Sequence, residues 1–151
     1  MRPLRVYVDT SVFGGAFDPE YRESTRLFFN RAATGRFRLV VSEQVEAEIN
    51  PAPEKVKQRY GDILAQAEFL PISDSIRLLA DIYRKNKAVV RKSLPDAMHV
   101  ALATINKCDG LISWNFKHIV RRDKSLLFNV INADNGHSQL FIATPKEVHA
   151  L

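Results

Sequence analysis

Short apolar runs along the chain alternate with longer segments whose apolar residues recur at helical spacing. The first run, residues 4–8, is rich in branched and aromatic side chains and stops at Asp9, which is followed by Thr10 and Ser11. A short apolar run with this ending is typical of a buried strand. We expect further strands at residues 37–41, 70–72, 111–113, 128–131 and 140–142.

The segments between these runs carry helix signals, because many of them begin at a capping residue or Pro and stop near Gly, Asn or Pro. We expect a loose turn at Gly14 and Gly15, helices at residues 23–33, 43–50, 54–67, 74–83, 96–106 and from 145 onward, and a helical turn at 116–120. Strands that alternate with helices predict an α/β fold whose central, mainly parallel sheet has helices on both faces. No repeat or linker interrupts the pattern, so we expect one domain over residues 1–151.

The composition indicates a folded globular protein. With 46% apolar residues, the chain can bury a sizeable core, and we do not expect an intrinsically disordered protein. The single cysteine, Cys108, cannot form an internal disulfide, and no apolar run approaches the length of a membrane span. We therefore expect a cytoplasmic protein that does not enter a membrane. The net charge of +5 allows a polyanionic partner but does not require one.

Polar side chains gather where the predicted strands end. Asp9 ends the first strand, Glu48 lies on the helix after the second, and Asp96 opens the helix before the third. Asn115 follows that third strand. In an open parallel sheet, ligands bind beyond the carboxyl ends of the strands, so these side chains are expected to converge there. The alternative is that the acids at helix starts only cap a helix or interact with its dipole.

Four segments in order make the chain similar to the PIN-domain family, and especially to its VapC-like branch of toxin ribonucleases: VYVDTSV, SEQVEAEI, PDAMHVALA and LISWNFKHI. The resemblance implies a PIN-like fold, Mg²⁺ or Mn²⁺ as cofactor, and RNA as substrate. It also implies that Asp9, Glu48 and Asp96 are the acidic metal ligands, with Glu46 as the substitute if the alignment slips. A small antitoxin protein and a second copy of the chain are the expected partners.

Asn115 departs from the family pattern, in which many members carry a fourth Asp. We expect its amide oxygen to serve as a neutral metal ligand or to bind a metal-bound water, and its alternative role is to cap the turn that follows. Three carboxylates can hold one hard cation whose coordination is completed by water. The loss of one negative charge puts a second metal ion in doubt.

Further residues are candidates for supporting roles. Thr10 and Ser11 could steady the acids or a phosphate, although capping is an equal alternative. His99 and His118 each follow a site residue by three positions and could donate hydrogen bonds, but buried or surface histidines without a role in the site are the commoner case. The candidate contacts to RNA are the basic residues Arg84, Lys85, Lys87, Arg91, Lys92, Arg121, Arg122 and Lys124.

Two other functions remain open. A PIN-like domain could bind RNA or protein without catalysis. The chain could also be a phosphatase with Asp9 as covalent nucleophile, but such enzymes usually carry a second Asp two residues later, where this chain has Ser11. A metal-dependent ribonuclease, the toxin of a type II toxin–antitoxin pair, is the function we expect.

Overall fold

The computed structural model describes residues 2–148, and within these residues five parallel strands form one sheet in the order β3-β2-β1-β4-β5. The strands are β1 (Leu4–Val8), β2 (Phe37–Ser42), β3 (Glu68–Leu70), β4 (Gly110–Ile112) and β5 (Phe141–Ala143). The expected α/β fold with a parallel sheet is therefore confirmed. None of the described helices is long and apolar enough to cross a membrane.

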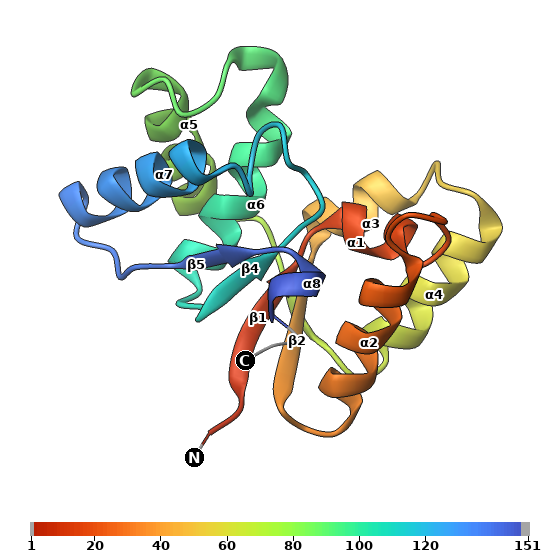
Figure 1. The fold of residues 1–151 in the computed structure, drawn as a ribbon. Helices are drawn as coiled ribbons and strands as arrows, with labels where there is room; N and C mark the ends of the chain where they lie inside the picture. Colours follow the sequence, from red (N-terminus) through yellow and green to blue (C-terminus); the bar gives the residue numbers. More distant parts are fainter. Residues whose placement is uncertain (1, 149–151) are drawn as a thin grey trace.

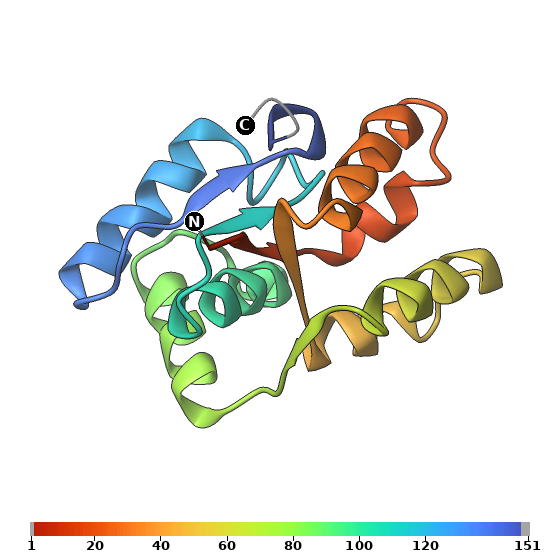
Figure 2. The ribbon, with the colours of Figure 1, turned by 90° about the horizontal axis from the view of Figure 1, so that it is seen from below.

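Helices lie on both sides of the sheet, as expected (Figures 1 and 2). In Figure 1, α5, α6 and α7 lie together on one side of the strands, and α1, α2 and α4 lie on the other. The helices are α1 (Thr10–Gly15), α2 (Arg22–Ala33), α3 (Glu43–Ile49), α4 (Glu54–Leu64), α5 (Asp74–Lys85), α6 (Leu94–Ile105), α7 (Arg122–Asp134) and α8 (Pro145–Val148). A short 3-10 helix, η1 (Arg91–Ser93), leads directly into α6.

The central strand β1 fixes the position of the residues that follow it. Val6, Tyr7 and Val8 are completely buried, because β1 lies between β2 and β4 in the middle of a sheet that helices cover on both faces. The register aligns Val8 with Ile112, and the amide of Asp9 donates to the carbonyl of Ile112 at 3.0 Å. The chain therefore leaves β1 and β4 at the same level, at the carboxyl edge of the sheet.

Three local predictions differ from the structure. The strand expected at 70–72 is displaced, because β3 spans Glu68–Leu70. Residues 128–131 form part of α7, in which Phe128 and Ile131 are buried while Val130 is 55% exposed. A run of four residues with three apolar side chains fits either period, and only the packing of one face against α5 distinguishes a helix from a strand. Gly14 and Gly15 belong to α1 rather than to a loose turn.

Candidate active site

Asp9 is held at the carboxyl edge of the sheet by two serine hydroxyls. Its Oδ2 atom accepts hydrogen bonds from Ser113 Oγ at 2.6 Å and from Ser11 Oγ at 2.8 Å. Asp9 is only 4% exposed, and Ser113 is completely buried. Because both hydroxyls bind Oδ2, the other carboxylate oxygen, Oδ1, is left to face the neighbouring side chains.

Glu48 approaches Asp9 from α3, which begins directly after β2. Ser42 caps this helix, since its hydroxyl accepts from the backbone amide of Val45 at 3.2 Å. Glu48 Oε1 accepts from Thr10 Oγ1 at 2.6 Å, and its Oε2 accepts from Gln44 Nε2 at 2.7 Å. Thr10 therefore steadies the second acid, and Ser11 steadies the first.

His99 connects the two acids. It lies on α6, is 1% exposed, and places its Nε2 atom 2.9 Å from Glu48 Oε1 and 3.3 Å from Asp9 Oδ1. Its other ring nitrogen, Nδ1, lies 2.7 Å from the hydroxyl of Tyr7, which in turn lies 2.7 Å from Ser42 Oγ. Ligand atoms of Asp9, Glu48 and His99 all lie within 4.8 Å of one another, a spacing that a metal ion could bridge.

The electrostatics of this cluster follow from its burial. Burial alone would raise the pKa of Glu48, but the hydrogen bond and charge of His99, with the donors Thr10 and Gln44, lower it to about 2. Burial would lower the pKa of His99, but the charges of Asp9 and Glu48 outweigh it and raise that pKa. These surroundings therefore stabilise the negative charge of Glu48 and the positive charge of His99.

Asp96 lies in the first turn of α6, half-buried, beside this cluster. Burial and the charge of Asp9 raise its pKa, although the imidazoles of His118 and His99 act in the opposite direction. Its Oδ1 atom accepts from Asn115 Nδ2 at 3.1 Å. All four site residues expected from the sequence thus lie at one edge of the sheet, with Asp96 outside the closest cluster.

Asn115 is oriented differently from our expectation. Its amide oxygen accepts from the backbone amide of His118 at 3.0 Å and so caps the turn at 116–120, while its nitrogen faces Asp96. The oxygen that we expected to bind a metal ion or its water thus accepts a hydrogen bond within the turn. His118 takes part in this cap through its backbone.

The basic residues divide into paired and unpaired groups. Arg84 and Lys85 form ion pairs with Asp81 on the same helix, and Arg121 pairs with Asp123. Lys124 Nζ donates to the carbonyl of Ala88 at 3.1 Å, which brings the two basic segments together. The remaining members of the set are exposed, and among residues 2–148 they have no ion-pair partner: Lys87, Arg91, Lys92 and Arg122.

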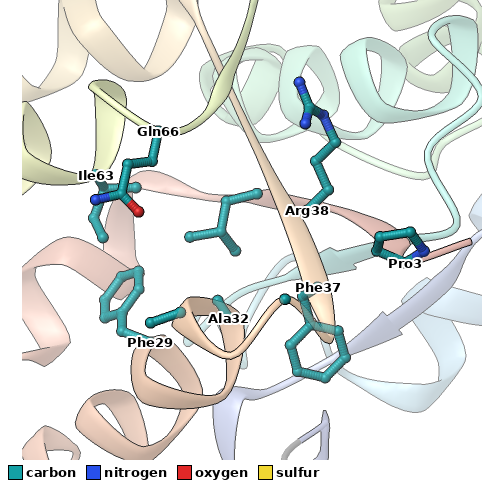
Figure 3. Close-up of a pocket in the computed structure, with 10 residues that line it drawn as sticks. Pro3, Phe29, Ala32, Phe37, Arg38, Ile63 and Gln66 are labelled. Atoms are coloured by element: carbon teal, nitrogen blue, oxygen red, sulfur yellow. The ribbon is translucent and has the colours of Figure 1, made fainter.

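Sequence reasoning missed Tyr7 and Ser113 as members of the site. Tyr7 looks like a core residue of β1, and only its hydroxyl reaches His99. Ser113 follows β4 just as Asp9 follows β1, and this equivalent position was the available signal. A separate apolar pocket between α2, β2 and the end of α4 lies at the opposite end of β2 and contains none of these residues (Figure 3).

A family model for the PIN domain matches residues 6–127. The chain belongs to the PIN-domain family. The matched segment includes every acid of the site. None of the curated proteins matches the sequence significantly.

Solved structures share the fold of this PIN domain at low sequence identity. The VapBC2 complex of Rickettsia felis, bound to a promoter DNA fragment, has a chain with a TM-score of 0.61 and 13% identity, and the match covers 93% of this chain and 98% of that one. For a chain of a toxin–antitoxin complex from Klebsiella pneumoniae, the TM-score is 0.59 and the identity is 20%. The match covers 79% of this chain and 93% of that one. For tyrosyl-tRNA synthetase from Archaeoglobus fulgidus, the TM-score is 0.55 and the identity is 12%, and the match covers 95% of this chain and 56% of that one. At these identities the likeness concerns the fold alone.

Proposed function

We propose that this PIN domain is an endoribonuclease that hydrolyses RNA phosphodiester bonds with the help of Mg²⁺ or Mn²⁺. The observation that carries the proposal is the approach of two carboxylates, Asp9 and Glu48, whose facing oxygens share a single nitrogen of His99. Carboxylates held this close attract a cation. Their oxygens are ligands that suit Mg²⁺ and Mn²⁺, so the donor set fits such an ion.

A bound divalent ion would lower the pKa of a water molecule and stabilise negative charge on the phosphate oxygens. The residues of the chain have the task of holding the ligands. Ser11 and Ser113 bind one oxygen of Asp9 and leave the other directed into the cluster. Asp96 would contribute a third carboxylate from α6, oriented by the amide of Asn115.

The exposed basic residues would hold the RNA backbone beside these acids. Arg91 and Lys92 lie in η1, which leads into the first turn of α6 and therefore to Asp96. Arg122 begins α7, two residues before the Lys124 contact that joins the two basic segments. Contacts of this kind bind phosphates without reading the base sequence.

We also propose that the domain is the toxin of a toxin–antitoxin pair, restrained by a small antitoxin protein, and that it forms a homodimer. The likeness of its fold to chains in the Rickettsia felis and Klebsiella pneumoniae complexes supports this role. Induction of the gene should stop cell growth, and co-expression of the proposed antitoxin should restore it. Light scattering on the purified protein measures its oligomeric state.

Cleavage of an unstructured RNA tests the proposed chemistry. The purified protein should cleave the RNA with Mn²⁺ or Mg²⁺ and stop when a chelator is added. Asp9→Asn should abolish cleavage, because it removes one charge from the metal site, and it should also abolish the rise in melting temperature that the ion gives the parent. The control is Asp62→Asn, which changes an exposed carboxylate on α4 and should behave as the parent.

The other outcomes distinguish the alternatives. RNA binding without cleavage in any divalent ion would contradict the proposal and favour a binding module. Cleavage that survives Asp9→Asn would contradict the assigned site. A phosphorylated Asp9 trapped from a phosphate ester would favour a phosphatase, although Ser11 donates a hydrogen bond to Asp9 where such enzymes carry a second acid.

A further inference from the structure

An exposed aromatic residue lies in the segment that carries the site residue Asn115. Phe116 directly follows Asn115, whose side chain binds Asp96, yet Phe116 is 50% exposed. Single exposed apolar residues are common and need no explanation by themselves. What distinguishes Phe116 is the group of aromatic rings on which it rests.

Phe116 packs on a stacked pair of rings. Tyr21 and Trp114 stack with their centroids 4.2 Å apart and their planes at 20°, and the ring of Phe116 lies 6.1 Å from Trp114 and 6.2 Å from Tyr21. The indole N–H of Trp114 donates to Thr25 at 2.9 Å. A Cβ atom on Gly15 would come within 2.6 Å of the indole nitrogen, so the glycine permits this close packing. The rings beneath Phe116 are therefore held in place.

Two hydrogen bonds fix this stack relative to the acids. The backbone amide of Trp114 donates to Ser11 Oγ at 2.9 Å, and the same hydroxyl donates to Asp9. Asn115, between Trp114 and Phe116, donates to Asp96. Hydrogen bonds thus link Asn115 to Asp96 directly, and Trp114 to Asp9 through Ser11. Lys117, which follows Phe116, is exposed and has no ion-pair partner among residues 2–148.

We propose that Phe116 is a platform on which an unpaired RNA base stacks, next to the phosphate that the acidic cluster acts on. The proposal rests on the proposed ribonuclease function and adds a residue that positions the substrate. An aromatic face accepts any base, because every base has a π-face, and Lys117 can bind the adjoining phosphate. A base held on a rigid ring beside the acids would place the neighbouring phosphodiester bond at the site.

The test measures RNA binding by fluorescence anisotropy in the Asp9→Asn background, which keeps the probe intact. The probes are a short unstructured oligoribonucleotide and a series of the same RNA with one base removed at each position in turn. Phe116→Ala should weaken binding of the intact RNA about 10-fold, and Phe116→Trp should retain it. Phe69→Ala is the matched control, because Phe69 is 43% exposed on β3 at the far edge of the sheet and should leave binding unchanged.

The series of abasic probes identifies stacking directly. At one position, removal of the base should weaken binding by the parent and leave Phe116→Ala unaffected, because the ring and the base would act as a pair. An equal loss for parent and variant at every position would overturn the proposal, and so would unchanged binding by Phe116→Ala. If that variant changed only the oligomeric state in light scattering, Phe116 would belong to a protein interface instead. In each of these cases the parent protein, in which Asp9 is unchanged, should still cleave RNA with a divalent ion. The proposed function would therefore stand.

Discussion

The hydroxyl of Tyr7 lies between His99 and Ser42 and determines how His99 meets the acids. Each of the two hydroxyls can rotate to donate or accept, so Tyr7 can satisfy Nδ1 of His99 in either protonation state. Burial raises the pKa of Tyr7, which keeps its proton in place. This chain of hydrogen bonds holds the imidazole so that Nε2 faces Glu48 and Asp9.

Tyr7→Phe should therefore reduce activity beyond its effect on stability. The matched control is Tyr83→Phe, because Tyr83 is equally buried and binds Asn132 and Thr104 away from the acids. Both variants should lower the free energy of unfolding by about 1–3 kcal/mol. Only Tyr7→Phe should also reduce divalent-ion affinity or cleavage, by roughly 10-fold or more. Calorimetric titration and cleavage rates measure the difference, and equal losses in the two variants would contradict the role of Tyr7.

Asn115 contributes a cap for the turn and a hydrogen-bond donor to Asp96, but no charge. Substitutions at this position can separate the two contributions. Asn115→Asp keeps an oxygen for the amide of His118 but replaces the donor to Asp96 with a second negative charge. Without metal, we expect the free energy of unfolding to fall by about 1–2 kcal/mol, and Mn²⁺ should then raise the melting temperature more than in the parent. Asn115→Ser retains a cap without the charge and is the control. Identical Mn²⁺ responses in both variants would show that Asn115 does not act on the metal site.

At the scale of elements, α1 supports the site because it lies between the acids and the aromatic stack. It begins at Thr10, which binds Glu48, and ends at Gly15, against which the indole of Trp114 packs. The helix spans only six residues, so its own hydrogen bonds cannot stabilise it. Its packing must do so, and that packing requires the glycine at its end.

Two neighbouring glycines in α1 should respond oppositely to the same substitution. At Gly15, a Cβ atom would lie 2.6 Å from Trp114 and 3.0 Å from Thr25, so Gly15→Ala should lower the free energy of unfolding by about 1–3 kcal/mol. At Gly14, no atom lies within 4 Å of an added Cβ, and Gly14→Ala should raise it by about 0.5–1 kcal/mol. Urea unfolding followed by the fluorescence of Trp114, the single tryptophan of the chain, measures both. If Gly15→Ala were as stable as the parent, the indole of Trp114 would be free to move away from the added Cβ atom.

At the scale of the whole molecule, the net charge of +5 coexists with a site built from carboxylates. The acids of the site lie at the carboxyl edge of the sheet. The exposed cations of η1 lie in a segment that leads to this edge, and those at the start of α7 lie next to Lys124, which contacts the other basic segment at Ala88. Such an arrangement attracts a polyanion toward a negative centre only if the cations bind its flanking phosphates.

Reversal of two charges near the site should therefore weaken RNA binding in a salt-dependent way. The double variant Arg91→Glu with Lys92→Glu should reduce affinity and flatten the dependence of log K on log salt, by about 0.7 for each phosphate that the variant no longer binds. The control, Arg36→Glu, changes an exposed cation just before β2, at the opposite end of the sheet, and should have a smaller effect. If both variants show the same slope, η1 does not bind the RNA backbone.

The sequence alone determined the fold class and the position of the acids along the chain. The apolar runs of β1, β2 and β4 are mostly buried and are predicted clearly from their composition. The signals for α3 and α6 predict the starts of these helices within about two residues. Because parallel strands end at one edge, Asp9, Glu48, Asp96 and Asn115 could be predicted to converge.

Which atoms meet depends on how the elements pack against one another. The run at 128–131 fits either a strand or a helix, and its packing in α7 made the choice. The amide of Asn115 could turn either way until its oxygen met the turn and its nitrogen met Asp96. His99 is a candidate from its spacing to Asp96, whereas Tyr7 and Ser113 look like ordinary buried residues in the sequence. They join the site because sheet register and helix packing bring together residues that are distant along the chain, and local spacing carries no information about such contacts.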